Sequence, residues 1–120
     1  KEIQHGTLDI SFNRDDYRRR EIPSNSYPTH IPFPIEGKKV VLIDDVLFTG
    51  RSVRSALEAL VSFGRPSKVE LCVLIDRRFS RHLPIQPNYR GRQVDAINEE
   101  KVLVTWRETH EIDAVYLEQK

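Results

Sequence analysis

Two short apolar segments, each followed directly by aspartate, flank a stretch with the periodicity of an amphipathic helix. The first segment, 39–43 (KVVLI), precedes Asp44-Asp45, and the second, 69–75 (VELCVLI), precedes Asp76. Between them, apolar residues recur at helical spacing over 51–63. This order predicts a βαβ unit, and therefore an α/β fold with a central parallel sheet. Because apolar residues of both segments fall on both faces of an extended strand, we expect helices to cover both faces of the sheet.

Size and composition restrict the class of protein. The chain has 120 residues, so we expect a single domain over 1–120. The net charge of +1 does not indicate a polycation, and no apolar run is long enough to cross a bilayer. Cys72 is the only cysteine, which excludes a disulfide scaffold and a cysteine-built zinc site. We therefore expect a cytoplasmic protein without a membrane segment.

The remaining segments give weaker patterns. Partial alternation of apolar and polar residues predicts a strand within 1–12. Four prolines predict an irregular stretch over 13–37, and a stretch of this length is typical of a functional lid or of a disordered segment. The arginine-rich stretch 77–98 is expected to be irregular. Short apolar runs predict strands at 101–106 and 114–117, at a sheet edge or in a hairpin.

The segment 40–52 (VVLIDDVLFTGRS) has the features of a phosphate site beside a polyol or metal site. A strand delivers two carboxylates, and Thr49, Gly50 and Ser52 then lead into a helix whose first N–H groups lack intrahelical partners. The carboxylates suit sugar hydroxyls or hydrated Mg²⁺. A phosphorylated ribose combines both requirements. The alternative is that the aspartates only end a strand and that the hydroxyl residues only cap a helix.

With its flanking segments, this stretch resembles a known family. It is similar to the phosphoribosyl-diphosphate (PRPP) signature of type I phosphoribosyltransferases, and it matches neither a Walker A loop nor a GxGxxG fingerprint. Further segments resemble, in order, the PyrR family of pyrimidine operon attenuation regulators with uracil phosphoribosyltransferase activity: 5–16, 31–38, 56–66, 74–77 and 82–85.

The resemblance implies a type I phosphoribosyltransferase fold that lacks its N-terminal helix and strand in this chain. It implies that Asp44 and Asp45 hold the ribose hydroxyls and the Mg²⁺ that accompanies PRPP. The 5′-phosphate would be bound by the residues that follow the acidic pair: Val46, Leu47, Phe48, Thr49, Gly50, Arg51 and Ser52. Phe48 stands where the family often has tyrosine, so the ring is kept without its hydroxyl group.

The same resemblance assigns the lid and the base. Arg14 and Asp15, with Asp16, would be the first residues of a flexible loop that closes over PRPP and excludes water. Uracil would be bound in a hood, largely by backbone groups, near the following residues: Asp76, Arg77, Leu83, Pro84 and Ile85. The implied reaction joins uracil and PRPP to give UMP and diphosphate.

A second function from another class stays open. In the PyrR family a UMP-responsive, RNA-binding attenuator acts on the leader transcript of the pyrimidine operon. Arg81 could contact RNA phosphates, whereas Gln86 stands where RNA-binding members generally have arginine. The basic stretch 77–92 suits an anionic partner, although a solvated loop would have the same composition. The resemblance also implies a homodimer or a larger homo-oligomer.

Overall fold

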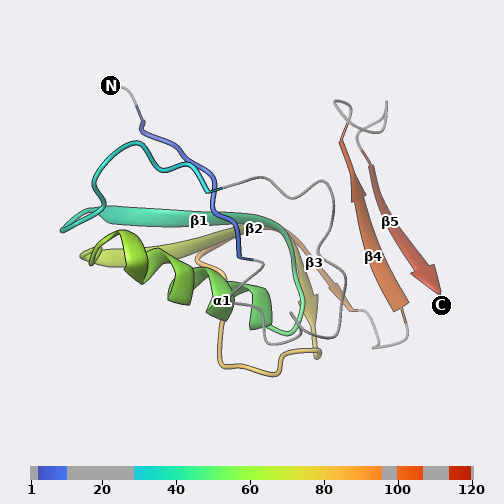
Figure 1. The fold of residues 1–120 in the computed structure, drawn as a ribbon. Coiled ribbons are helices and arrows are strands. Elements are labelled where there is room, and N and C mark those ends of the chain that lie inside the picture. Colours follow the sequence, from blue (N-terminus) through green and yellow to red (C-terminus); the bar gives the residue numbers. More distant parts are fainter. Residues whose placement is uncertain (1–2, 11–28, 96–99, 107–113, 120) are drawn as a thin grey trace. The chain divides into compact units, whose positions relative to one another are not determined.

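The computed structural model describes residues 3–10, 29–95, 100–106 and 114–119 (Figure 1). The elements follow one another along the chain as β1 (Lys39–Leu47), α1 (Arg51–Leu60), the short 3₁₀ helix η3 (Val61–Phe63), β2 (Lys68–Arg78), β3 (Tyr89–Asp95), β4 (Glu100–Thr105) and β5 (Ala114–Gln119).

The first three strands form one sheet in the order β1-β2-β3. Strand β3 runs parallel to β2, in a register that pairs Cys72 with Tyr89 at one end and Arg78 with Asp95 at the other. The predicted α/β class with a parallel sheet is therefore confirmed. The carboxyl ends of β2 and β3 lie together, which is where ligands bind in sheets of this type.

The chain divides into two compact units, and each has its own buried residues. The first unit comprises Lys1–Val41 and Gly50–Glu70, and the second comprises Leu42–Thr49 and Leu71–Lys120. Buried apolar residues of the first unit are Ile35, Val53, Ala59 and Leu60, and those of the second are Leu47, Leu71, Val73, Ile75 and Val104.

The helix expected over 51–63 is confirmed as α1 followed by η3. It begins after Gly50, whose φ of 96° lies in the left-handed region that favours glycine. It ends before Gly64, where an added Cβ would lie 3.0 Å from Cγ1 of Ile35. Both glycines therefore fix where the helix starts and stops.

The expectation that helices cover both faces of the first strand is wrong for the described residues. Burial alternates along β1, and Val41 and Ile43 remain 44% and 79% exposed. The strand also continues through the acidic pair instead of ending there. It extends to Leu47, which is only 2% exposed, so burial of that side chain favours the longer strand.

Two further expectations are corrected. The stretch 77–98 is not irregular throughout, because β2 extends to Arg78 and β3 occupies Tyr89–Asp95. The sequence of β3 (YRGRQVD) is mostly polar and exposed, so it pairs with β2 through the backbone and has no apolar pattern. Residues 3–10 form no strand, only an isolated bridge between Thr7 and His30.

Strands β4 and β5 form an antiparallel hairpin, with register pairs from Glu100–Gln119 to Thr105–Ala114. The expectation of two short hairpin strands is thus confirmed. No helix in the part of the chain that the structure describes combines the length and the apolar sequence that crossing a membrane requires.

Candidate functional site

The acidic pair lies inside β1, and the backbone N–H groups of Asp45 and Val46 hold its carboxylates. The N–H of Asp45 donates to Oδ1 of Asp44 at 2.8 Å, and the N–H of Val46 donates to Oδ1 of Asp45 at 2.7 Å. Both aspartates are exposed. The pair is therefore a group of two adjacent carboxylates at the surface.

The local environment raises the pKa of Asp44 to about 6. The first cause is desolvation: although the residue as a whole is exposed, its carboxyl group is crowded by protein atoms. The hydrogen bond to the side chain of Asp45 and the charge of that neighbour raise the pKa further, against the backbone N–H of Asp45, which lowers it. A cation bound here would favour the ionised form.

The residues after the acidic pair divide between the two units. In the second unit Leu47 is buried, Phe48 is half-buried, and the carbonyl of Thr49 accepts hydrogen bonds from the N–H groups of His82 and Leu83 at 2.9 and 3.2 Å. The guanidinium of Arg77 lies over the ring of Phe48, 4.0 Å from its centroid. This stretch is therefore tied firmly to the loop that follows β2.

The predicted phosphate residues of the first unit begin α1. Gly50 is its N-cap and provides no side-chain hydrogen bond, and Arg51 and Ser52 are exposed in the first turn. The first intrahelical bond joins the N–H of Arg54 to the carbonyl of Gly50 at 3.0 Å. The N–H groups ahead of it are those that an anion can bind at a helix start.

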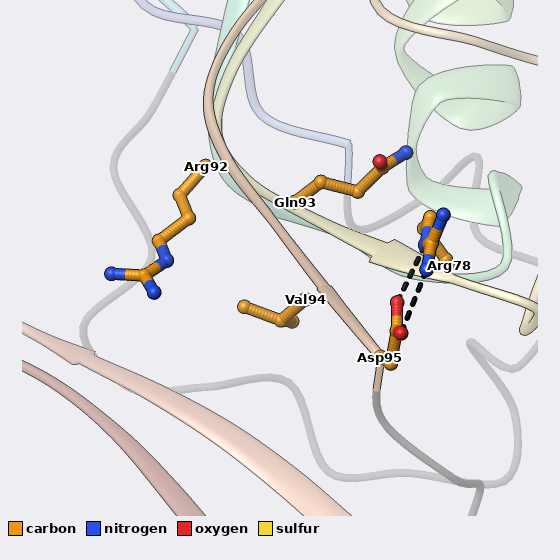
Figure 2. Close-up of a pocket in the computed structure, with 5 residues that line it drawn as sticks. All are labelled: Arg78, Arg92, Gln93, Val94 and Asp95. Carbon is orange, nitrogen blue, oxygen red and sulfur yellow. Dashed lines mark hydrogen bonds and ion pairs between the residues drawn. The ribbon is translucent and has the colours of Figure 1, made fainter.

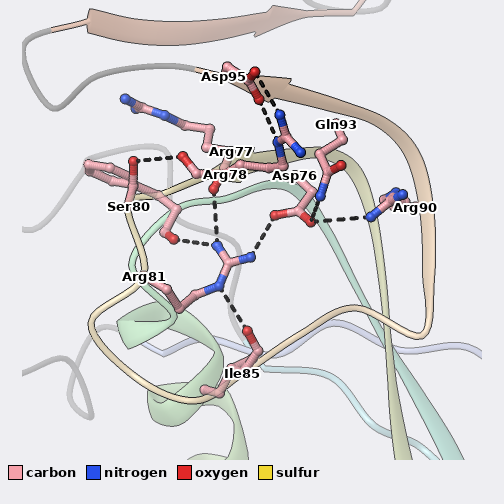
Figure 3. A network of polar contacts seen from close by, with 10 residues as sticks. Asp76, Arg77, Arg78, Ser80, Arg81, Ile85, Arg90, Gln93 and Asp95 are labelled. Atoms are coloured by element: carbon pink, nitrogen blue, oxygen red, sulfur yellow. Dashed lines mark hydrogen bonds and ion pairs between the residues drawn. The ribbon is translucent and has the colours of Figure 1, made fainter.

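Asp76 lies buried in a polar network at the carboxyl end of β2 (Figure 3). Its Oδ1 accepts a bond from Nη2 of Arg81 at 2.6 Å. Its Oδ2 lies 3.4 Å from Nε2 of Gln93 and 3.8 Å from Nη1 of Arg90. A buried carboxylate is stable when such partners satisfy it. Asp76 therefore has a structural role at the predicted uracil site.

Arg81, the candidate RNA contact, directs its guanidinium to acceptors within the protein. Its Nε donates to the carbonyl of Ile85 at 2.8 Å, and its Nη1 donates to the carbonyls of Phe48 and Arg77 at 2.6 and 3.3 Å. Of the other residues predicted in this loop, Leu83 and Ile85 are half-buried, and Pro84 and Gln86 are exposed.

A pocket of about 430 Å³ opens at the ends of β2 and β3 (Figure 2). It is lined by Arg78, Arg92, Gln93, Val94 and Asp95. Arg78 and Asp95 form a two-bond ion pair, Nε to Oδ1 at 2.5 Å and Nη2 to Oδ2 at 2.7 Å. That hydrogen bonding lowers the pKa of Asp95 below its ordinary value. Asp76 bonds to Gln93, so this pocket adjoins the buried network.

Sequence reasoning did not identify these pocket residues as a site. Only the density of arginine over 77–92 indicated a functional surface there, because the polar sequence of β3 concealed the strand that positions them. Arg14, Asp15 and Asp16 lie outside the described residues.

Comparisons with known proteins identify the family and the fold of this chain. The model of the "Phosphoribosyl transferase domain" family matches residues 4–109. The bifunctional protein PyrR of Desulfosudis oleivorans is 50% identical over 113 residues, which cover 94% of this chain and 62% of that protein. The bifunctional protein PyrR of Bacillus cereus is 44% identical, and the match covers 100% of this chain and 67% of that protein. The chain thus spans about two thirds or less of the length of these relatives.

Solved structures show the same fold. A hypoxanthine phosphoribosyltransferase from Staphylococcus aureus matches with a TM-score of 0.56 and 24% identity, over 77% of this chain and 52% of that one. The Trypanosoma cruzi enzyme in complex with IMP matches with a TM-score of 0.60 and 19% identity, over 81% and 52%. At these identities the likeness supports the predicted phosphoribosyltransferase fold and nothing about the substrate.

Proposed function

Because this chain belongs to the phosphoribosyltransferase domain family and, within it, to the PyrR family, we propose that its full-length protein transfers phosphoribosyl from PRPP to uracil. The products are UMP and diphosphate. The observation that carries the proposal is the exposed acidic pair in the last part of β1, which is followed by a loop that leads into the start of α1. Ribose hydroxyls are ligands that such a pair can bind.

The donor set of the acidic pair also fits the Mg²⁺ that would accompany PRPP. Mg²⁺ in proteins is typically held by one or two carboxylates, together with water and ligand phosphates. Among the described residues no group of three or more His, Cys, Asp or Glu side chains could hold a metal ion, so Asp44 and Asp45 would share the ion with the substrate. When bound, Mg²⁺ supplies positive charge to the departing diphosphate.

The loop after the pair would hold the 5′-phosphate. In this proposal the backbone N–H groups of 46–49 and of the first turn of α1 donate to phosphate oxygens, and Thr49 and Ser52 add hydroxyl donors. Gly50 has no side chain to obstruct the helix start. These bonds fix one end of the substrate and orient its reacting carbon.

Uracil would lie against the loop that follows β2, in the pocket at the ends of β2 and β3. The pocket volume of about 430 Å³ is in the range of small-molecule sites. The Arg92 guanidinium offers donors and the Gln93 amide offers a donor and an acceptor, which complement the carbonyl and N–H groups of a pyrimidine. Asp76, Arg77 and 83–85 would shape the remaining wall.

In the transfer itself, the bond between the ribosyl carbon and diphosphate breaks while a uracil nitrogen attacks that carbon. The carbon gains oxocarbenium character, and the negative charge of Asp44 and Asp45 stabilises it. Diphosphate leaves with the bonding electron pair, and the attacking nitrogen loses its proton. Arg14 and Asp15 would stand at the start of the loop that closes over PRPP and keeps water from this carbon.

RNA binding is the second candidate function. Arg90 and Arg92 are exposed on β3 and offer positive charge to a phosphate backbone. Arg81 uses its guanidinium inside the protein and Gln86 is uncharged, so both contribute little to such a surface. We propose the leader RNA of the pyrimidine operon as that partner, and a cytoplasmic homodimer or larger homo-oligomer as the functional assembly.

Substrate specificity tests the proposal directly. Purified full-length protein is given PRPP and Mg²⁺ with uracil, hypoxanthine, guanine or orotate, and nucleotide formation is measured for each base. We expect turnover with uracil alone. Turnover with hypoxanthine or guanine and none with uracil would show that the protein is a purine phosphoribosyltransferase.

A further inference from the structure

The guanidinium of Arg81 connects three parts of the chain that are distant in sequence. Its Nη1 donates to the carbonyl of Phe48 at 2.6 Å, after β1, and to that of Arg77 at 3.3 Å, in β2. Its Nη2 binds Asp76 at 2.6 Å, and its Nε donates to the carbonyl of Ile85 at 2.8 Å. Figure 3 shows the group pointing from its loop into this ring of acceptors.

Further contacts join the same parts. The N–H groups of His82 and Leu83 donate to the carbonyl of Thr49 at 2.9 and 3.2 Å. The Arg77 guanidinium lies 4.0 Å from the centroid of the Phe48 ring. The loop 79–85 and the segment 46–49 are therefore joined by backbone bonds as well as by the side chain of Arg81.

The shape of the Arg81 side chain suits this position. The side chain is 21% exposed and that of Asp76 is 4% exposed, so water competes weakly for their bond. The planar guanidinium directs donors to four acceptors at once, whereas the ammonium of lysine is a compact point charge that cannot. Both charge and geometry are needed here.

We propose that Arg81 is a positioning residue that clamps the loop 79–85 to the segment 46–49 and so fixes the spacing between the two ends of the nucleotide site. This inference rests on the proposed function, which places the 5′-phosphate at 46–52 and uracil beside 76–85. Arg81 touches neither end of the ligand in this scheme. It acts through Asp76 and the carbonyl of Phe48.

A clamp of this kind affects ligands with two ends more than ligands with one. UMP would bind the segment 46–49 with its phosphate and the loop 79–85 with its base. Once one end is bound, the other end binds at an effective concentration that the spacing of the two segments sets. Uracil or ribose 5-phosphate needs only one of the two. If the spacing is less well fixed, the affinity for UMP therefore falls, whereas the affinities for uracil and for ribose 5-phosphate change little.

Amide hydrogen exchange tests the clamp without any nucleotide. In full-length Arg81→Lys we expect the N–H groups of His82 and Leu83 to exchange about tenfold faster than in the wild type. The N–H of Asn88, bonded to the carbonyl of Leu71 at 2.8 Å, should keep its rate. The control is Arg54→Lys, an exposed arginine on α1 that pairs with Glu58 at 3.2 Å.

Calorimetric titration then measures the affinities of UMP, uracil and ribose 5-phosphate. We expect Arg81→Lys to bind UMP about tenfold more weakly and each half within about threefold of the wild type. Arg81→Gln, which keeps an amide donor toward Asp76, serves if the lysine variant does not fold. Equal losses for all three ligands, or unchanged exchange at residues 82 and 83, would overturn the clamp.

The same experiments separate the clamp from the function on which it rests. If residues 82 and 83 exchange faster in the variant but wild-type protein binds no UMP, the clamp stands and the proposed function fails. If UMP binds and is made but exchange is unchanged, the function stands and Arg81 does not position the loop.

Discussion

Asp44 and Asp45 are neighbours in sequence but differ in their surroundings. Crowding by protein atoms, together with the adjacent carboxylate, raises the pKa of Asp44 to about 6. The carboxylate of Asp45 accepts the N–H of Val46 and faces solvent. Two adjacent carboxylates repel each other and so lower the stability of the fold, and such pairs are typical of sites selected for ligand binding.

The first prediction concerns Asp45 in the proposed reaction. Asp45→Asn keeps the shape and the bond to the N–H of Val46 but removes one negative charge beside the ribosyl carbon. We expect kcat/KM for UMP formation to fall at least about 100-fold, with an unchanged circular dichroism spectrum. Glu58→Gln, an exposed change on α1, is the control. Unchanged kinetics for Asp45→Asn would refute the role of the pair.

The second prediction concerns the pH dependence that Asp44 introduces. Its folded-state pKa of about 6 exceeds the ordinary value of 3.8, so between these values the folded state holds more protons than the unfolded state. The free energy of unfolding therefore falls as the pH rises through this window. Asp44→Asn should remove the effect and be more stable at pH 7 by about 1 kcal/mol or less, because the residue is exposed.

Urea unfolding of the wild type and of Asp44→Asn at pH 4 and pH 7 measures this difference. We expect the gap in stability to be larger at pH 7. In the wild type, the affinity for PRPP with Mg²⁺ should rise with pH through about 6, since the ionised carboxylate is the form that binds. A gap that is larger at pH 4 would contradict the raised pKa.

At the scale of elements, the sequence predicts those helices and strands whose apolar residues recur with a regular period. The helical spacing of Val53, Ala56, Leu57, Leu60 and Val61 made the helix over 51–63 predictable, and the run 69–75 made most of β2 predictable. Strand β3 was missed because its residues are polar and its pairing with β2 depends on backbone bonds. The pocket at its end was missed for the same reason.

Gly91 lies where β3 approaches β2 closely. An added Cβ at Gly91 would lie 2.7 Å from the carbonyl oxygen of Leu74 in β2, so even alanine forces the two strands apart. We expect Gly91→Ala to lower the free energy of unfolding by about 1–3 kcal/mol and to weaken uracil binding. Thermal unfolding and titration with uracil measure both effects.

Gly37→Ala is the matched comparison for this prediction. Nothing lies within 4 Å of its added Cβ, but its φ of 71° is strained for alanine, so only the conformational cost remains. We expect a loss of about 1 kcal/mol without a change in uracil affinity. If Gly91→Ala were as stable as the wild type, β3 would not approach β2 closely at this position.

At the scale of the whole molecule, the sequence predicts candidate site residues but not the contacts that hold them. The acidic pair and the loop to Ser52 followed from their order in the sequence. The sequence offered Arg81 as a possible RNA contact, and it does not show that the guanidinium binds acceptors of Phe48, Asp76, Arg77 and Ile85. Such contacts join positions distant in sequence, and a single sequence holds no record of them.

The inward position of Arg81 leads to the last prediction, on RNA binding by the full-length protein. If β3 offers its exposed arginines to RNA, the affinity for the pyrimidine-operon leader falls as salt rises, because each phosphate contact releases counterions. Arg92→Gln should weaken binding and reduce the slope of log K against log salt by about one. Arg54→Gln, on α1 in the other unit, should leave the slope unchanged. An unaltered slope for Arg92→Gln, with tight binding in the wild type, would place the RNA on another surface.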